Sequence, residues 1–320
     1  MQFTRDIRRV LQRKALDTEA MALLWGAILD GSVDAVEIGA VVGALAAAGE
    51  TRSELAGLYR AARARLTRWS PPIRTGTVSM AAYGLVPGEA VAVALACALL
   101  RRFEIPVVIH GVLDSPCGVS TAYVLRELGV LPCASFAQAD EKLAAEGVAF
   151  LPGQLVSPAF ASLIALRGRL GVENIAHLAA QALDPTQGLA TRLTFSADGT
   201  LSERFEALAG EADGDSVAAR WPAGRSPLNL SIRPRIERIR GGIREVLFEA
   251  DAQETPTALT RPPDDAPGIA QWVRRATSGA VPFPIPALAL ASACLYAVGG
   301  APDFSQAKAI AALHAGRVAA

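Results

Sequence analysis

Seven arginines lie between residues 220 and 244, and Glu237 is the one carboxylate in that span. The planar guanidinium fork fits phosphate oxygens, so a dense run of arginines is typical of a polyanion-binding surface. The alternative is a solvated face partly neutralised by nearby carboxylates. The run comprises Arg220, Arg225, Arg233, Arg235, Arg238, Arg240 and Arg244, and its candidate acidic partners include Glu203, Glu206, Asp213 and Asp215.

A second stretch with possible chemistry runs from residue 110 to 129, HGVLDSPCGVSTAYVLRELG. His110 and Gly111 end an apolar segment, and Ser120 and Thr121 stand at the start of a predicted helix. Free N–H groups at a helix N-terminus bind anions, and a Ser or Thr side chain caps such a helix. The stretch therefore predicts an anion pocket. A histidine hydrogen-bonded at a strand end, without a functional role, is the other interpretation of His110.

The composition excludes several classes of protein. The chain has 320 residues, 51% of them hydrophobic, and 31 basic side chains balance 31 acidic ones, so no overall charge attracts nucleic acid or membrane. Four scattered cysteines and three histidines lack the spacing of a zinc site, and we expect no metal and no cofactor. The N-terminus lacks a signal-peptide pattern, and the apolar run 91–100 is too short for a membrane span. We therefore expect a cytoplasmic protein without membrane contact.

The spacing of apolar residues predicts two domains. Helical periodicity from residue 17 to 68 predicts three or four helices, and the Trp-Ser-Pro-Pro segment 69–72 ends them. Strands and helices then alternate, as in βαβ units around a mostly parallel sheet. We expect an α/β protein with a helical domain at 1–70, joined by helices from 156–185, and a larger α/β domain at 71–320. Expected strands lie near residues 73–80, 105–111 and 147–152.

Four segments together carry a resemblance to a known family. Residues 15–63 have Thr-Glu at a helix start and Gly-Glu-Thr before an acidic helix; residues 105–129 have His-Gly before a Ser-Thr helix start. Residues 156–185 contain Ser-Pro-Ala, an arginine and Leu-Gly, and LALASACLYAVGGAPDFSQAKAIAALHAGRVA ends the chain in helices. These segments resemble the anthranilate phosphoribosyltransferases, of glycosyl transferase family 3. The resemblance implies a nucleoside phosphorylase or phosphoribosyltransferase-like fold.

The resemblance also implies chemistry that this chain lacks. The family holds phosphoribosyl pyrophosphate on a Gly-Thr-Gly-Gly-Asp turn, whose counterpart we expect at Arg74–Met80, with one glycine and no aspartate. The substrate-binding Asn-Arg is Val112-Leu113 here, and residues 219–234, expected at the magnesium site, contain no carboxylate. Arg167 matches an arginine that contacts anthranilate in the family. Several lost contacts of about 2.7–4 kcal/mol each predict no useful turnover, so we assign no catalytic residue and no metal ligand.

Loss of these groups with a gain of arginines resembles the YbiB-type branch of the family, whose members keep the fold as homodimers and bind nucleic acid without strong sequence preference. The resemblance implies a nonspecific DNA- or RNA-binding homodimer that is not an enzyme. The arginines expected to extend the run are Arg101, Arg102, Arg167 and Arg169, and a further candidate face on the first helix has Arg5, Arg8, Arg9 and Arg13.

Two other functions stay open at this point. An active phosphoribosyltransferase of the anthranilate type is favoured by the extent of the resemblance, by Arg167 and by the Ser120 helix start. A nucleotide or small-anion sensor would use a residual substrate pocket. That pocket would contain His110, Gly111, Ser120, Thr121 and Arg167. The sequence leaves open whether the nucleic acid is DNA or RNA, single or double stranded, and which arginines share one face.

Overall fold

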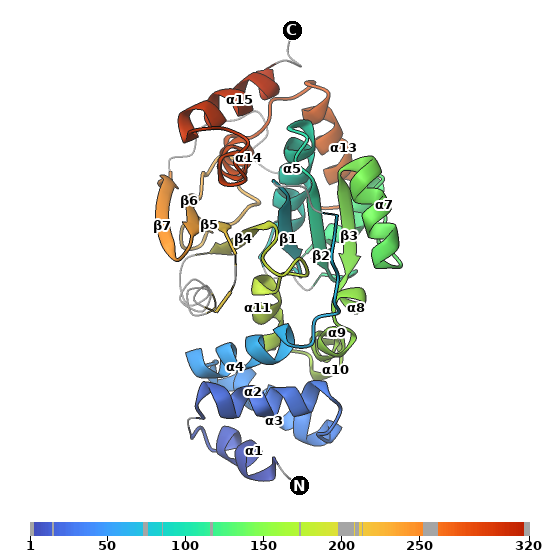
Figure 1. The fold of residues 1–320 in the computed structure, drawn as a ribbon, viewed down its shortest axis with the longest axis vertical. Coiled ribbons are helices and arrows are strands. Elements are labelled where there is room, and N and C mark those ends of the chain that lie inside the picture. The colour runs from blue at the N-terminus through green and yellow to red at the C-terminus, as the bar shows by residue number, and fades with distance from the viewer. Residues whose placement is uncertain are drawn as a thin grey trace. The chain divides into compact units, whose positions relative to one another are not determined.

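The computed structural model of the protein describes residues 3–14, 16–72, 76–84, 86–115, 118–172, 174–197, 208, 211–212, 214–251 and 262–316. The chain divides into two compact units, each assembled from separate stretches of sequence. Unit 1 comprises Met1–Arg68, Gly153–Pro185 and Glu203–Ala212; unit 2 comprises Trp69–Pro152, Thr186–Ser202 and Asp213–Ala320. Figure 1 shows the elements of both units, with the first helices in blue and the last in red.

Unit 1 is helical. Its helices are α1 (Thr4–Leu11), α2 (Thr18–Leu29), α3 (Ala35–Ala48), α4 (Arg52–Arg63), α8 (Gly153–Val156), α9 (Pro158–Ala165), α10 (Arg167–Leu170) and α11 (Ile175–Ala182). Asp17 caps α2, and Thr51 and Glu54 form a reciprocal capping box at α4. Each such cap stabilises a helix start by about 1 kcal/mol. Gly57 lets α4 lie against α2, because a Cβ there would lie 2.5 Å from Met21 Cβ.

Unit 2 is built around a seven-stranded sheet in the order β3-β2-β1-β4-β5-β6-β7. Its strands are β1 (Val78–Ala82), β2 (Val107–Gly111), β3 (Val148–Pro152), β4 (Thr191–Ala197), β5 (Ser216–Trp221), β6 (Arg235–Arg240) and β7 (Ile243–Phe248). The first five strands pair in parallel, and β6 and β7 add an antiparallel hairpin at one edge. Parallel strands of this kind are buried, and β1 and β2 are buried along their whole length. The predicted α/β fold with a mostly parallel sheet is confirmed.

Helices pack around this sheet to form the core of unit 2. They are α5 (Glu89–Arg102), α6 (Thr121–Glu127), α7 (Phe136–Glu146), α13 (Ala266–Thr277), α14 (Ile285–Ala297) and α15 (Phe304–Gly316). One core cluster joins Met80 and Ile109 of the sheet to Cys97 of α5 and Cys294 of α14. Among the residues that the structure describes, no helix combines the length and the apolar composition needed to cross a membrane.

Two buried cysteines are expected to make the free energy of unfolding of unit 2 depend on pH in the alkaline range. Burial raises the pKa of Cys97 and of Cys294 to about 12, above the ordinary value of 9.0. Between these values the unfolded chain loses the thiol protons while the folded chain keeps them. We therefore expect stability to fall as pH rises from about 9 towards 12, by up to about 1.4 kcal/mol per pH unit for each thiol.

Urea unfolding at a series of alkaline pH values measures this effect. The double variant Cys97→Ala/Cys294→Ala is less stable overall because it leaves small cavities, but its stability should change less with pH over the same range. An equally steep pH dependence in the double variant would contradict the assignment to these thiols.

Candidate functional site

The carboxyl ends of parallel strands are where α/β sheets bind ligands, commonly at the N-terminus of the following helix. In unit 2 the first such turn connects Ala82, the last residue of β1, to Glu89, the first residue of α5. The neighbouring strand β2 ends at His110 and Gly111, which are in register with Ala81 and Ala82. We call this region, with Tyr83, Gly84, Glu89, His110 and Gly111, the ligand edge.

The pyrophosphate turn predicted at Arg74–Met80 is not at the ligand edge, and that assignment is corrected. The second half of the segment lies within β1, and Gly76 precedes the strand. Arg74 and Thr75 lie outside the described residues. The prediction relied on one glycine, although a strand was also expected near residues 73–80, and the strand is what the structure contains from Val78 onwards. Because β1 runs from Val78 to Ala82, Gly76 is at its amino end, opposite to the end where phosphate binds in such sheets.

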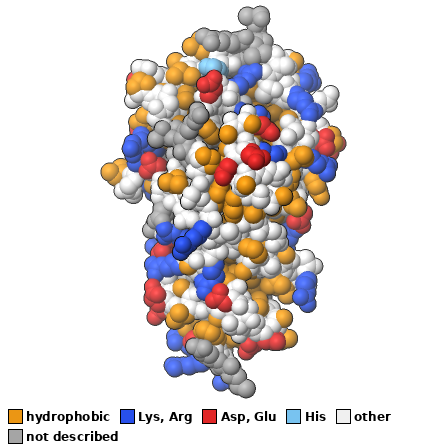
Figure 2. Space-filling model, turned by 45° about the vertical axis from the view of Figure 1, so that its right-hand side comes forward, with side chains coloured by type: hydrophobic (Ala, Val, Ile, Leu, Met, Phe, Trp, Pro, Cys, Tyr) orange, Lys and Arg blue, Asp and Glu red, His pale blue; other side chains and the backbone are white. Residues whose placement is uncertain are grey.

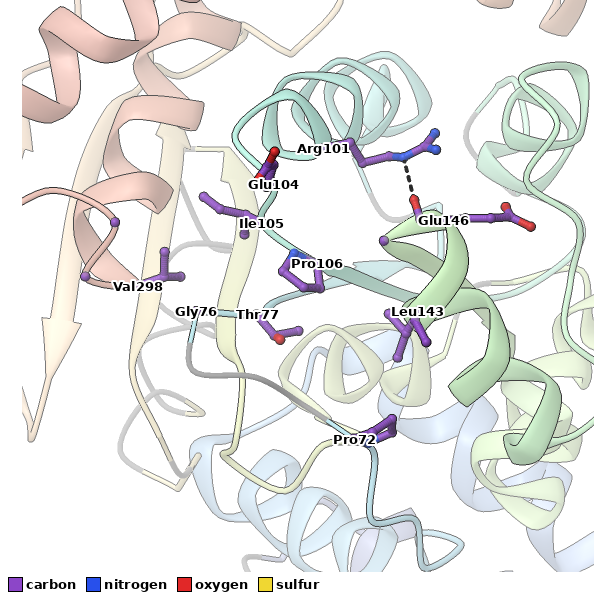
Figure 3. Close-up of a pocket in the computed structure, with 14 residues that line it drawn as sticks. Pro72, Gly76, Thr77, Arg101, Glu104, Ile105, Pro106, Leu143, Glu146 and Val298 are labelled. Carbon is purple, nitrogen blue, oxygen red and sulfur yellow. Dashed lines mark hydrogen bonds between the residues drawn. The ribbon is translucent and has the colours of Figure 1, made fainter.

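Gly76 instead lines a pocket of about 680 Å³ at the amino ends of β1 and β2 (Figure 3). The C-terminal ends of α5 and α7 reach this pocket, which is also lined by Glu104 and Glu146. Helix C-termini carry partial negative charge and the glutamates add to it, whereas Arg101 also lines the pocket, so the pocket has mixed charge. Arg101, predicted to bind nucleic acid, donates from Nε to the Glu146 carbonyl at 3.1 Å and connects α5 to α7.

A carboxylate of the chain itself lies at the N-terminus of α5. Glu89 is buried, and its Oε1 accepts a hydrogen bond from the Gly84 N–H at 2.8 Å. Burial, and secondarily the charge of Glu89, raise the pKa of Tyr83 well above its usual range, so its phenol stays protonated. Negative charge is favourable at a helix N-terminus. Glu89 therefore places a carboxylate of the chain in the first turn of α5, and the sequence analysis missed it.

His110 and Gly111 have packing roles at the ligand edge. His110 is buried; its Nδ1 lies 3.2 Å from the Tyr83 hydroxyl, and the two rings meet edge to face with centroids 5.5 Å apart. Gly111 allows β2 to approach β1, because a Cβ there would lie 1.9 Å from the Ala82 carbonyl oxygen. These contacts agree with the structural interpretation of His110.

The remaining residues of the predicted pocket are distributed over both units. Ser120 is the N-cap residue of α6, but it does not cap the helix as predicted, because its Oγ donates to the Leu113 carbonyl at 2.7 Å. A hydroxyl committed to a carbonyl in the preceding loop is turned away from the helix amides. Thr121 is the buried first residue of α6, whereas Arg167 belongs to α10 of unit 1.

Most of the predicted arginine run lies on the hairpin formed by β6 and β7. Glu237 on β6 is 6% exposed and lies at the centre of a charge cluster. Arg235 Nε lies 3.2 Å from its carboxylate, Arg220 Nη2 lies 3.7 Å away and Arg244 Nη1 lies 3.8 Å away. A buried carboxylate requires such partners, so these three arginines are partly neutralised within the fold.

Three further carboxylates pair with the hairpin, and the sequence analysis did not consider two of them, Glu245 and Glu249. The pairs are Arg235 with Glu249 at 2.7 Å, Arg238 with Glu245 at 3.5 Å and Arg240 with Asp215 at 3.3 Å. Asp215 was among the expected partners, whereas Glu203, Glu206 and Asp213 lie outside the described residues. Antiparallel pairing sets Glu245 directly opposite Arg238. The hairpin therefore carries interleaved charges of both signs.

The other predicted arginines differ in their surroundings. Arg225 is exposed in the turn after β5, and Arg233 lies over the ring of Phe248. Arg102 donates to the backbone carbonyls of Thr277 and His314, near the ends of α13 and α15, which is a structural role. Arg167 and Arg169 lie on α10 of unit 1. On the face shown in Figure 2, basic and acidic side chains are interspersed.

Helix α1 borders a hollow whose charged lining residues are all basic. Ile7 and Val10 are buried on one side of the helix. The other side borders an open hollow of about 620 Å³. This α1 hollow is lined by Thr4, Arg5, Arg8, Arg9, Gln12 and Lys14, without a carboxylate among these lining residues. Arg13, expected on the same face, instead donates to the Gly49 carbonyl at 2.9 Å.

Known proteins resemble this chain in the helical unit 1 and over nearly its whole length. Residues 6–66 match the family described as glycosyl transferase family, helical bundle domain. The chain is 29% identical over 294 residues to the uncharacterized protein YbiB of Escherichia coli (strain K12), covering 91% of each chain. Anthranilate phosphoribosyltransferase from Thermus thermophilus superposes with a TM-score of 0.69 at 20% identity, covering 97% of this chain and 94% of that one. The chain is similar in fold to the anthranilate phosphoribosyltransferases.

The sequence match to anthranilate phosphoribosyltransferases covers only part of the chain. It is 30% identical over 205 residues to the anthranilate phosphoribosyltransferase of Methylobacterium radiotolerans, covering 63% of this chain and 58% of that one. The solved structure, at 20% identity, establishes the fold alone. The chemistry of the chain therefore depends on its own residues at the ligand edge, the hairpin and the α1 hollow.

Proposed function

We propose that the protein is a cytoplasmic, sequence-nonspecific nucleic-acid-binding homodimer. The observation that carries the proposal is the α1 hollow, where Arg5, Arg8, Arg9 and Lys14 line one concavity without a carboxylate among the lining residues. Phosphodiester backbones bind such surfaces mainly through release of condensed counterions, which requires no base-specific contact.

The ligand edge supports binding rather than phosphoribosyl transfer. A transferase must place a diphosphate at the N-terminus of a helix such as α5, and here the Glu89 carboxylate is buried at that helix start. A diphosphate brought there would face a negative charge in a buried position, which is strongly unfavourable. The transferase alternative is supported by the fold and by the partial sequence match to the enzymes.

The homodimer is part of the same proposal. Leu23 of α2 is 68% exposed and Val36 of α3 is 79% exposed, and exposed apolar side chains on helices favour association with a second copy. Light scattering at the protein concentrations used for binding measures the mass of the particle.

Removing three cations of the α1 hollow is expected to weaken nucleic-acid binding on all sequences alike. The variant is Arg5→Ala/Arg8→Ala/Lys14→Ala, and fluorescence anisotropy with a labelled oligonucleotide over a salt series measures its affinity. Each lost phosphate contact reduces the slope of log K against log salt by about 0.7–0.9, so we expect a slope shallower by about 2 and an affinity at least about tenfold lower.

A matched variant distinguishes the effect of the cations in the α1 hollow from the effect of the total charge of the protein. Arg52→Ala/Arg68→Ala/Arg275→Ala removes the same charge from exposed positions outside the hollow and should retain most of the affinity. Equal losses in the two variants would contradict a site at α1. Absence of binding by the unmodified protein at low salt would overturn the proposed function.

A further inference from the structure

Three aromatic rings from separate elements meet at one edge of unit 2. Phe248 ends β7, Tyr296 lies on α14 and Phe304 begins α15. The ring of Phe304 is 5.0 Å from that of Phe248, edge to face, and 5.7 Å from that of Tyr296, measured between centroids. All three are partly buried and pack against the core cluster of the sheet while keeping part of their surface in solvent.

A basic side chain lies over each of these rings. The guanidinium carbon of Arg233 lies 5.2 Å from the Phe248 centroid, and Lys308 Nζ lies 5.1 Å from the Phe304 centroid. Arg233 is held over Phe248 by this cation–π contact and by a hydrogen bond from its Nε to the Glu249 carbonyl at 3.3 Å. Lys308 is exposed and Arg233 is partly exposed. These two pairs form the outer part of an aromatic–basic cluster.

The third pair is the inner part of the cluster. The guanidinium carbon of Arg238 lies 4.5 Å from the Tyr296 centroid, and its side chain is 11% exposed. Glu245 lies 3.5 Å from Arg238 and neutralises it in part, whereas Glu249 is paired with Arg235. Arg233 and Lys308 therefore provide the outward-facing positive charge of the cluster.

We propose that this aromatic–basic cluster stacks the bases of single-stranded nucleic acid, which gives the protein a preference for single strands over duplex. The inference rests on the proposed function and names its ligand more closely. Unpaired bases stack on aromatic side chains and on guanidinium planes, while adjacent cations contact the phosphates. The Phe248–Arg233 pair provides a guanidinium plane backed by a ring, and Lys308 lies over the adjoining Phe304.

Duplex nucleic acid makes poor use of such a cluster. Its bases are already stacked on one another inside the helix, so only its phosphates are available to Arg233 and Lys308. Extracting a base from the duplex has a free-energy cost of a few kcal/mol. The cluster therefore distinguishes the two forms of nucleic acid by base access, and does so without reading sequence.

The test compares three labelled probes on the unmodified protein: an oligothymidylate of about 15 nucleotides, an abasic strand of the same length, and a duplex. The thymidine and abasic strands carry the same phosphates and differ in their bases. We expect the thymidine strand to bind about ten- to hundredfold more tightly than the abasic strand, and more tightly than the duplex. Equal affinity for the thymidine and abasic strands would overturn the inference and leave the proposed function standing. Binding to none of the probes would overturn the proposed function.

Two variants test whether the aromatic–basic cluster causes the preference for the thymidine strand. Phe248→Leu/Phe304→Leu keeps apolar side chains at the core boundary and removes the rings; Arg233→Lys keeps the charge and removes the guanidinium plane. Both should lower affinity for the thymidine strand, about tenfold or more in the double variant, while affinity for the abasic strand stays unchanged. A thymidine preference that survives in both variants would overturn the assignment to this cluster.

Discussion

Replacing Gly111 with alanine is expected to lower the free energy of unfolding of unit 2 by about 4 kcal/mol. Gly111 ends β2 and is in register with Ala82 of β1. A Cβ at this position would lie 1.9 Å from the Ala82 carbonyl oxygen and 2.6 Å from the Ala82 carbonyl carbon. These are backbone atoms of the central sheet, so the added carbon can be accommodated only by separating two buried parallel strands.

The matched substitution is Gly147→Ala in the same unit. Gly147 has φ +69° at the C-cap of α7, and a Cβ there would meet nothing within 4 Å. Its replacement has only the backbone cost of the left-handed conformation, about 1 kcal/mol. Urea unfolding of both variants, monitored by circular dichroism, measures the difference. Similar destabilisation in the two would show that β1 and β2 do not approach as closely as described.

Replacing Glu89 with alanine is expected to destabilise unit 2 by about 3 kcal/mol, because it removes the acceptor of the Gly84 N–H and the negative charge at the start of α5. Glu89→Gln keeps an oxygen at the same position and loses only the charge. Its expected cost is smaller, about 1 kcal/mol.

Unfolding experiments on the two Glu89 variants separate these contributions. A second readout follows from the position of Glu89 beside Tyr83. With the negative charge removed, the pKa of Tyr83 should fall from its raised value, although burial still keeps it above that of a free tyrosine. Equal stability of the unmodified protein and Glu89→Ala would mean that the carboxylate does not hold the turn after β1.

Much of the fold could be predicted from sequence because its signals are local. Apolar runs at 105–111 and 147–152 are β2 and β3, since strands buried on both sides have to be continuously apolar. The capping box of Thr51 and Glu54 that starts α4 is such a local signal, because the motif is completed within four residues.

The candidate site could be predicted only in part. The pyrophosphate turn was assigned to Arg74–Met80, whose last three residues belong to β1, because a single glycine beside a strand does not reveal which end of the strand it flanks. Glu89 went unnoticed, although it directly follows Gly88 at the start of α5. The glycine-then-acid pattern is too common to indicate that this carboxylate would be buried against Gly84.

By itself the sequence determined the kinds of elements, the mostly parallel sheet, the dense arginines at 220–244 and the lack of carboxylates at 219–234. The tertiary structure alone decided which groups meet. Strand register sets Glu245 opposite Arg238, and packing of three separate elements gathers Phe248, Tyr296 and Phe304. Helix and strand formation depend on neighbours along the chain, whereas ion pairing and ring contacts depend on distances between residues that the fold brings together from far apart in sequence.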